Sequence, residues 1–130
     1  MKSYARAPLH GVQTLDGFRL DELRAAAHAA GHSLVQVELG ACQDKRAVLA
    51  AIAQALNLSP AFGGNLDALY DSLTDLPEAM SAGLALVLEH IPHGPGFDAD
   101  ARSDLLEVLR DAAAFHAGSG PAFRVFYCLA

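Results

Sequence analysis

The sequence predicts an α/β fold in which a three-stranded, mostly parallel sheet is packed with helices. Three short segments have the apolar character of strands, residues 33–39, 84–91 and 123–129. Segments with helical spacing separate them, and helical crossovers join parallel strands. The length of 130 residues suits one domain with one core. We therefore expect a single domain over residues 20–130, preceded by an N-terminal arm of uncertain order, residues 1–19.

The first half of this domain has the pattern helix, strand, helix. Residues 20–30 are strong helix formers, and Gly31 is placed to end that helix in a left-handed C-cap. Residues 33–39 alternate apolar and polar positions between two glycines, which predicts a strand. We expect Asp44 to cap a second helix over residues 44–56, and the Ser–Pro pair that follows to end it.

The second half continues with a short helix, a strand, a longer helix and a last strand. Asn65 is the expected N-cap of the short helix. Residues 84–91 form a nearly continuous apolar run, typical of a strand buried on both faces. Ser103 is the expected cap of a helix over residues 104–117. Residues 123–129 predict the last strand, which we place at an edge of the sheet.

Charge and composition restrict the class of partner. Nine basic and fifteen acidic residues give a net charge of −6, which argues against nucleic-acid binding and favours a basic partner. Between Arg46 and Arg102 the chain has no Lys or Arg. Only two cysteines, Cys42 and Cys128, are present, so we expect free structural thiols in a reducing, cytoplasmic setting. No apolar run resembles a signal peptide or a membrane span, so we expect no membrane partner.

The segment FGGNLDALYDSLTD, residues 62–75, carries three aspartates in a row on the short helix. Asp67, Asp71 and Asp75 are spaced i, i+4 and i+8, and like charges at this spacing cost about 0.2–0.5 kcal/mol per pair. The leucines of the segment fall on the opposite side, so the aspartates should face solvent. Helix geometry alone leaves open a solvated helix face or a docking surface.

Aromatic and glycine residues accompany these aspartates. Tyr70 lies between the leucine side and the acidic side, where its ring can be partly exposed. Phe62 precedes Gly63 and Gly64, and this loop offers a backbone that a partner can approach closely. Charged, aromatic and backbone contacts are therefore expected on one small surface.

The segment FGGNLDALYDSLTDLP resembles the barstar family of intracellular ribonuclease inhibitors. In that family an aromatic-Gly-x-Asn-Leu/Trp-Asp-Ala-Leu-aromatic-Asp segment forms the loop and helix that plug the active site of a secreted ribonuclease. The order of elements in residues 33–129 also resembles the family. The resemblance implies a barstar-like fold and a binding protein rather than an enzyme, without cofactor or catalytic residues. It implies a basic, extracellular-type, barnase-like ribonuclease as the partner.

The resemblance also assigns binding roles to acidic residues. Asp67 and Asp71 fall on the two helix aspartates that meet the enzyme's Arg and Lys, and Asp71 takes the position of the phosphate. Asp111 falls where the best-studied member has a glutamate at the edge of the interface. These roles are implied by the resemblance.

Other positions match the family or depart from it. Gly63 and Asn65 match the binding loop, and Tyr70 stands where the best-studied member has a tryptophan. Ala61 and Leu76 stand where that member has a tyrosine and a second interface tryptophan. Aromatic anchors carry much of the energy of many interfaces, so these two departures bear on the identity of the partner.

Two further functions stay open beside the inhibitor. The same fold could serve as an acidic adaptor for a basic partner that is not a nuclease. The three aspartates could also hold Mg²⁺ in an enzyme, but one exposed helix stripe lacks the converging second element that such a site needs. Glu89, His90 and His93 lie close in sequence, yet no further ligand spacing accompanies them, and we expect no metal site.

Overall fold

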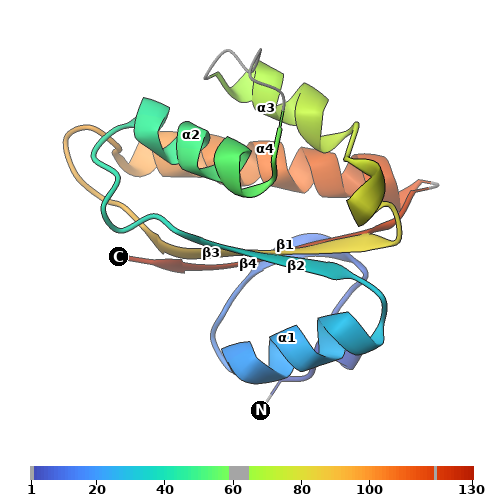
Figure 1. Ribbon diagram of the computed structural model, residues 1–130. Coiled ribbons are helices and arrows are strands. Elements are labelled where there is room, and N and C mark those ends of the chain that lie inside the picture. The colour runs from blue at the N-terminus through green and yellow to red at the C-terminus, as the bar shows by residue number, and fades with distance from the viewer. Residues whose placement is uncertain (1, 59–64, 119) are drawn as a thin grey trace.

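The computed structural model describes residues 2–58, 65–118 and 120–130 of the chain. These residues form a four-stranded sheet with strand order β1-β4-β3-β2, and each neighbouring pair is parallel. Helices α2, α3 and α4 lie on one side of the sheet and α1 lies on the other (Figure 1). The strands are β1 (His10–Thr14), β2 (Ser33–Glu38), β3 (Gly83–Ile91) and β4 (Ala122–Leu129). The helices are α1 (Leu20–Ala29), α2 (Lys45–Ala55), α3 (Leu66–Leu73) and α4 (Ala99–Ala117), with short 3-10 turns η1 (Tyr4–Arg6) and η2 (Glu78–Met80).

The α/β class and the parallel pairing are confirmed, but the sheet has four strands rather than three. The additional strand, β1, pairs with β4 from His10 opposite Phe123 to Thr14 opposite Tyr127. The sequence of β1, HGVQT, lacks the apolar alternation that marks a strand. All five of its residues are half-buried, so neither side of the strand is distinctly apolar. Because β1 covers β4, the last strand lies inside the sheet, and the prediction of an edge strand is wrong.

Strand β3 is the centre of the core, as its apolar run predicts, because both of its faces are buried. Leu84, Leu86 and Leu88 point toward α2, α3 and α4 and join the larger apolar cluster. Ala85 and Val87 point the other way, toward α1 and the smaller cluster. Successive residues of a strand face opposite sides, so this one segment supplies large side chains to one core and small ones to the other.

Three helix ends follow the local rules of capping. The Asp44 carboxylate accepts a hydrogen bond from the Ala47 N–H at 2.8 Å and caps α2, as predicted. Gly31, with φ of 77°, adopts the left-handed conformation predicted after α1. Helix α2 ends before the Ser59–Pro60 pair, which lies outside the described residues, and Asn57 follows it with φ of 54°. Asparagine tolerates this conformation better than most residues.

The start of α4 differs from the prediction. The helix begins at Ala99, four residues before the predicted cap at Ser103. The Asp98 carboxylate accepts a hydrogen bond from the Ala101 N–H at 2.9 Å and caps the helix. Aspartate and serine are both good N-caps, and the alanine-rich residues between them are good helix formers, so the helix extends to the earlier cap. Ser103 lies within α4.

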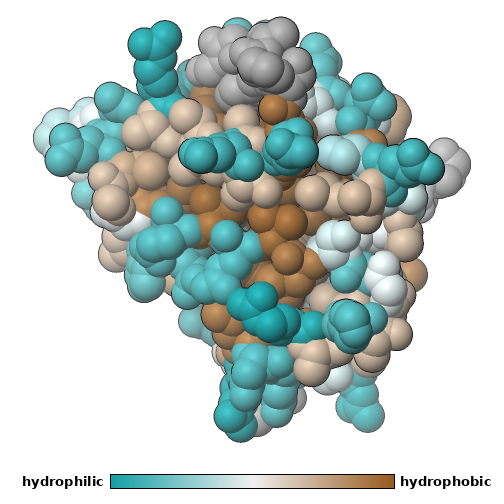
Figure 2. All heavy atoms as spheres, in the orientation of Figure 1, coloured by the Kyte–Doolittle hydropathy of each residue, from teal (hydrophilic) through white to brown (hydrophobic). Residues whose placement is uncertain are grey.

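The molecular surface is mixed in character. On the face shown in Figure 2, apolar side chains gather in the middle and hydrophilic side chains surround them. In the described part of the chain, no helix combines the length and the apolar character needed to cross a membrane.

Tyr4 attaches the N-terminal segment to the second face of the sheet. Its side chain is 4% exposed and its ring lies 6.0 Å from that of Phe126. The guanidinium of buried Arg124 lies 3.9 Å from the centre of the Tyr4 ring and donates a hydrogen bond to the Tyr4 carbonyl. The Tyr4 hydroxyl is 2.7 Å from His32 Nδ1. One aromatic side chain thus joins η1, β4 and the residue that precedes β2.

Burial shifts the pKa values of Tyr4 and His32. Burial raises the pKa of the Tyr4 phenol, an effect that nearby Arg124 opposes. Burial and the charge of Arg124 both lower the pKa of His32. A neutral His32 ring can therefore accept at Nδ1 the hydrogen bond that the Tyr4 hydroxyl donates. A Cβ on Gly83 would clash with the His32 ring, so this packing requires glycine there.

Acidification should weaken the fold through His32. Because the folded state lowers the pKa of His32 below its ordinary value of 6.5, the unfolded chain binds a proton more readily than the folded chain. The contribution to stability is complete above that value and declines as the pH falls below it. Urea unfolding from about pH 7.5 to about pH 5 should show a smaller decline in His32→Gln than in the control His28→Gln. Equal declines in the two variants would contradict this assignment.

Removing the Tyr4 side chain should cost about 3 kcal/mol in the free energy of unfolding, because Tyr4→Ala leaves a cavity beside Phe126 and removes the ring against which the Arg124 guanidinium lies. Urea denaturation measures this change. Arg6→Ala, in the same short turn but exposed, is the matched control and should change stability little. A Tyr4→Ala protein as stable as the control would show that the N-terminal segment is not attached in this way.

Candidate functional site

Helix α3 presents its acidic side to solvent, as predicted. The Asn65 side chain accepts a hydrogen bond from the Ala68 N–H at 2.8 Å and caps the helix. Leu69 and Leu73 are fully buried on the inner side. Asp67 and Asp71 are exposed on the outer side, one turn apart.

The third aspartate lies outside the helix. Helix α3 ends at Leu73, and the N–H of Asp75 donates to the Ser72 carbonyl at 3.2 Å in the turn that follows. The Thr74 hydroxyl donates to the Asp71 carbonyl at 3.0 Å, which satisfies one of the last carbonyls of the helix. The expected row of three helix carboxylates is therefore a helical pair, with Asp75 displaced beyond the C-terminus.

A groove between α3 and α4 collects most of the described site residues. It has a volume of about 640 Å³ and is open to solvent. Its lining comes from one side of α3 and the facing side of α4, and consists of Asp67, Tyr70, Asp71, Val108, Asp111, Ala114 and Phe115. The structure thus brings Asp111 beside the helix aspartates, across forty residues of sequence. We call this feature the α3–α4 groove.

Within the described part of the protein, no carboxylate of the α3–α4 groove forms an ion pair. Its carboxylates belong to Asp67, Asp71 and Asp111, and each of these residues is exposed. The ion pairs among described residues lie elsewhere: Arg19 with Asp21, and His90 with Glu38. Three like charges with two aromatic rings beside them make a surface suited to a cationic partner.

A buried histidine that the sequence analysis missed fixes the position of α3. His116, 5% exposed, donates through Nε2 to the Leu73 carbonyl at 2.7 Å. Its ring stacks on Phe123 of β4, with the ring centres 5.2 Å apart. The bond satisfies a carbonyl at the C-terminal end of α3 and links this helix to α4 and the sheet. The signal in the sequence that could have indicated this role is the position of His116 on the apolar side of the helical pattern of α4.

The remaining predicted site residues either do not line this groove or lie outside the described residues. Asp75 lines a separate shallow hollow of about 330 Å³ with Asn57, Leu58 and Asp71 among others. Leu76 is half-buried and packs against the main apolar cluster. Phe62, Gly63 and Gly64 lie outside the described residues, as does Ala61.

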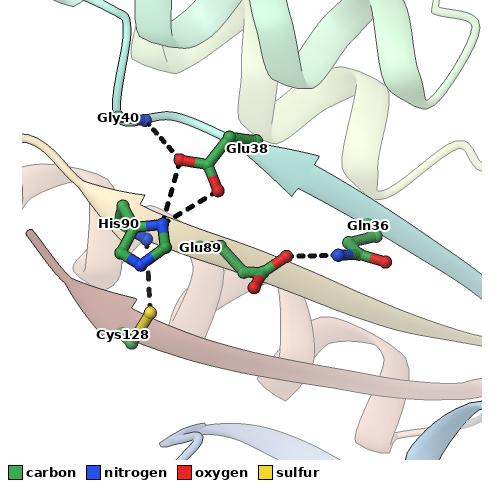
Figure 3. Close-up of polar contacts among 6 residues, drawn as sticks. All are labelled: Gln36, Glu38, Gly40, Glu89, His90 and Cys128. Carbon is green, nitrogen blue, oxygen red and sulfur yellow. Dashed lines mark hydrogen bonds and ion pairs between the residues drawn. The ribbon is translucent and has the colours of Figure 1, made fainter. Parts of the chain in front are cut away.

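A second polar cluster lies at the carboxyl ends of β2, β3 and β4 (Figure 3). Glu38 accepts hydrogen bonds from the Gly40 N–H and from the Nδ1 of His90, the latter at 2.9 Å. The His90 backbone N–H donates to Cys128 Sγ at 3.3 Å. His90 adopts φ of 56° where the pairing of β3 with β4 becomes irregular.

In this second cluster, Glu38 and His90 form an exposed ion pair. The Glu38 carboxylate raises the pKa of His90, and the hydrogen bond from His90 lowers the pKa of Glu38. Glu89 is bound instead to Gln36 (Figure 3). Within the described residues, no group of three or more His, Cys, Asp or Glu side chains is placed to hold a metal ion.

Comparison with known proteins places this geometry in context. A family model described as Barstar (barnase inhibitor) matches residues 32–128, which include β2, β3, all of β4 except its last residue, and all the residues that line the α3–α4 groove. The chain matches no curated protein.

Removing the Asp71 carboxylate should leave the fold intact and raise the free energy of unfolding by about 0.2–0.5 kcal/mol, because it relieves repulsion with Asp67. Asp67→Ala is the matched variant. It relieves the same repulsion but loses a favourable charge in the first turn of α3, so it should be the less stable of the two. Urea denaturation compares them. An Asp71→Ala protein destabilised by more than about 1 kcal/mol would show that the carboxylate supports the fold.

Proposed function

Because the chain belongs to the barstar family, we propose that it inhibits a basic ribonuclease by covering the enzyme's active site with α3 and the loop before it. The observation that carries the proposal is the α3–α4 groove, where Asp67, Asp71 and Asp111 gather and none of them forms an ion pair with a described residue. A cationic active site supplies the missing charge.

The chemistry of inhibition follows from the position of Asp71. A ribonuclease holds Arg, Lys and His side chains around the phosphate that it cleaves. The Asp71 carboxylate, carried on a packed helix, can accept charge-assisted hydrogen bonds from these groups. A carboxylate offers no bond for the enzyme to cleave, so the cations are occupied without turnover.

The two aspartates on α3 should speed association with the enzyme as well as stabilise the complex. A surface of one sign attracts a partner of opposite sign over a distance that salt limits, and this raises the association rate. A cell that makes its own ribonuclease gains from fast capture, which agrees with a cytoplasmic inhibitor. The proposed contact surface also includes Phe62, Gly63, Gly64, Asp75 and Leu76.

The acidic adaptor is the second candidate, and the same charges favour it. It differs in one observable: an adaptor binds a basic protein without blocking an active site. An enzyme that uses Mg²⁺ on the aspartates has less support, because Asp75 lies beyond the end of α3 and outside the groove formed by the other two.

Calorimetric titration with a small basic microbial ribonuclease should show tight binding that weakens between about 20 mM and about 150 mM salt. RNA cleavage by the enzyme should stop at equimolar inhibitor. Asp71→Ala should raise Kd by about 100-fold or more, because the enzyme's cations then lose a buried partner.

Glu22→Ala is the control for this titration. It changes the net charge by the same amount, but it lies in α1, on the opposite side of the sheet (Figure 1). It should leave Kd nearly unchanged. A folded wild-type protein that fails to bind contradicts the proposal, and binding without inhibition favours the adaptor. Equal effects of Asp71→Ala and Glu22→Ala on Kd would show that binding depends only on the net charge of the protein.

A further inference from the structure

One aromatic side chain is exposed without any role in the core. Among the described phenylalanine and tyrosine residues, Phe115 alone is exposed, at 54%. A phenylalanine left half in water forgoes much of the stabilisation that its burial would bring. Phe115 lies near the end of α4 and lines the α3–α4 groove. Its exposure is therefore concentrated beside the three carboxylates.

The Phe115 ring is also held in a defined orientation. It meets the His116 ring edge to face, with ring centres 5.3 Å apart and planes at 88°. His116 is itself fixed by its hydrogen bond to the Leu73 carbonyl and its stacking on Phe123. An exposed side chain that rests on an immobile neighbour has less conformational freedom to lose when a partner binds.

Asp111 and Phe115 form a matched pair on α4. They are four residues apart, so they are neighbours on one side of the helix and face the groove together. Asp67 and Asp71 form the corresponding pair on α3. The α3 wall of the groove thus presents two carboxylates beside Tyr70, and the α4 wall combines one carboxylate with an exposed phenylalanine ring.

We propose that Phe115 is an aromatic anchor for an arginine of the ribonuclease, whose guanidinium lies on the Phe115 ring while its N–H groups pair with Asp111. The inference rests on the proposed function and specifies the partner's side chain. A planar guanidinium can stack on a ring and pair with a carboxylate at the same time. A lysine ammonium is a compact, strongly hydrated charge and matches this combination less well. An aromatic contact here supplies binding energy that Ala61 and Leu76, both without a ring, do not.

The test is a series at this position, titrated against the same basic ribonuclease. Phe115→Tyr keeps the ring and should bind within about twofold of wild type, whereas Phe115→Leu keeps apolar bulk without a ring and should weaken binding about tenfold. Phe115→Ala should be at least as weak as Phe115→Leu. The loss should appear mainly in the dissociation rate, with the salt dependence retained, because the carboxylates remain.

Leu129→Ala is the control, since Leu129 is 49% exposed and lies outside the groove, at the end of β4. It should not change Kd. If Phe115→Leu binds as well as wild type, the arginine contact is overturned. If Phe115→Ala binds as well as wild type while Asp71→Ala does not, the anchor is wrong and the proposed function stands. If wild type itself does not bind, both proposals fall.

Discussion

The candidate site depends on one buried hydrogen bond, from the His116 imidazole to the Leu73 carbonyl. Helix α3 has eight residues, too few for a stable helix in isolation. Its place is set by the burial of Leu69 and Leu73 and by this bond, which connects it through His116 to the stacked Phe123 ring in the sheet. A helix held in this way can carry two unneutralised carboxylates, because packing rather than surface charge determines its position.

The two faces of the sheet have separate roles that meet in β3. The side with α2, α3 and α4 carries the α3–α4 groove, and its large core packs on the leucines of the strand. The other side is closed by α1 and by Tyr4, which lies under Arg124. The family match begins at residue 32, so β1 and α1 precede it. The residues before the match therefore complete the second core, and Val12 of β1 also packs against the larger apolar cluster on the side of the groove.

Much of the fold could be predicted from the sequence because it follows local rules. Apolar runs marked β2, β3 and β4, and the side chains of Asp44 and Asn65 marked helix starts. The missed features depend on tertiary contacts or on competing local signals. Strand β1 is recognisable only through its pairing with β4, and Asp98 competed with an equally good serine cap. The groove depends on how α4 lies against α3, which no spacing within either helix reveals.

The aspartates and Phe115 break two different rules of stability at the same place. Like charges one turn apart strain α3, and an exposed aromatic ring on α4 forgoes burial. Either feature alone is common on protein surfaces. Their meeting in one groove is more informative, because a bound cation relieves both: it neutralises the carboxylates and covers the ring. A single kind of ligand thus compensates two independent local costs, and such compensation is expected where a surface is built for a partner.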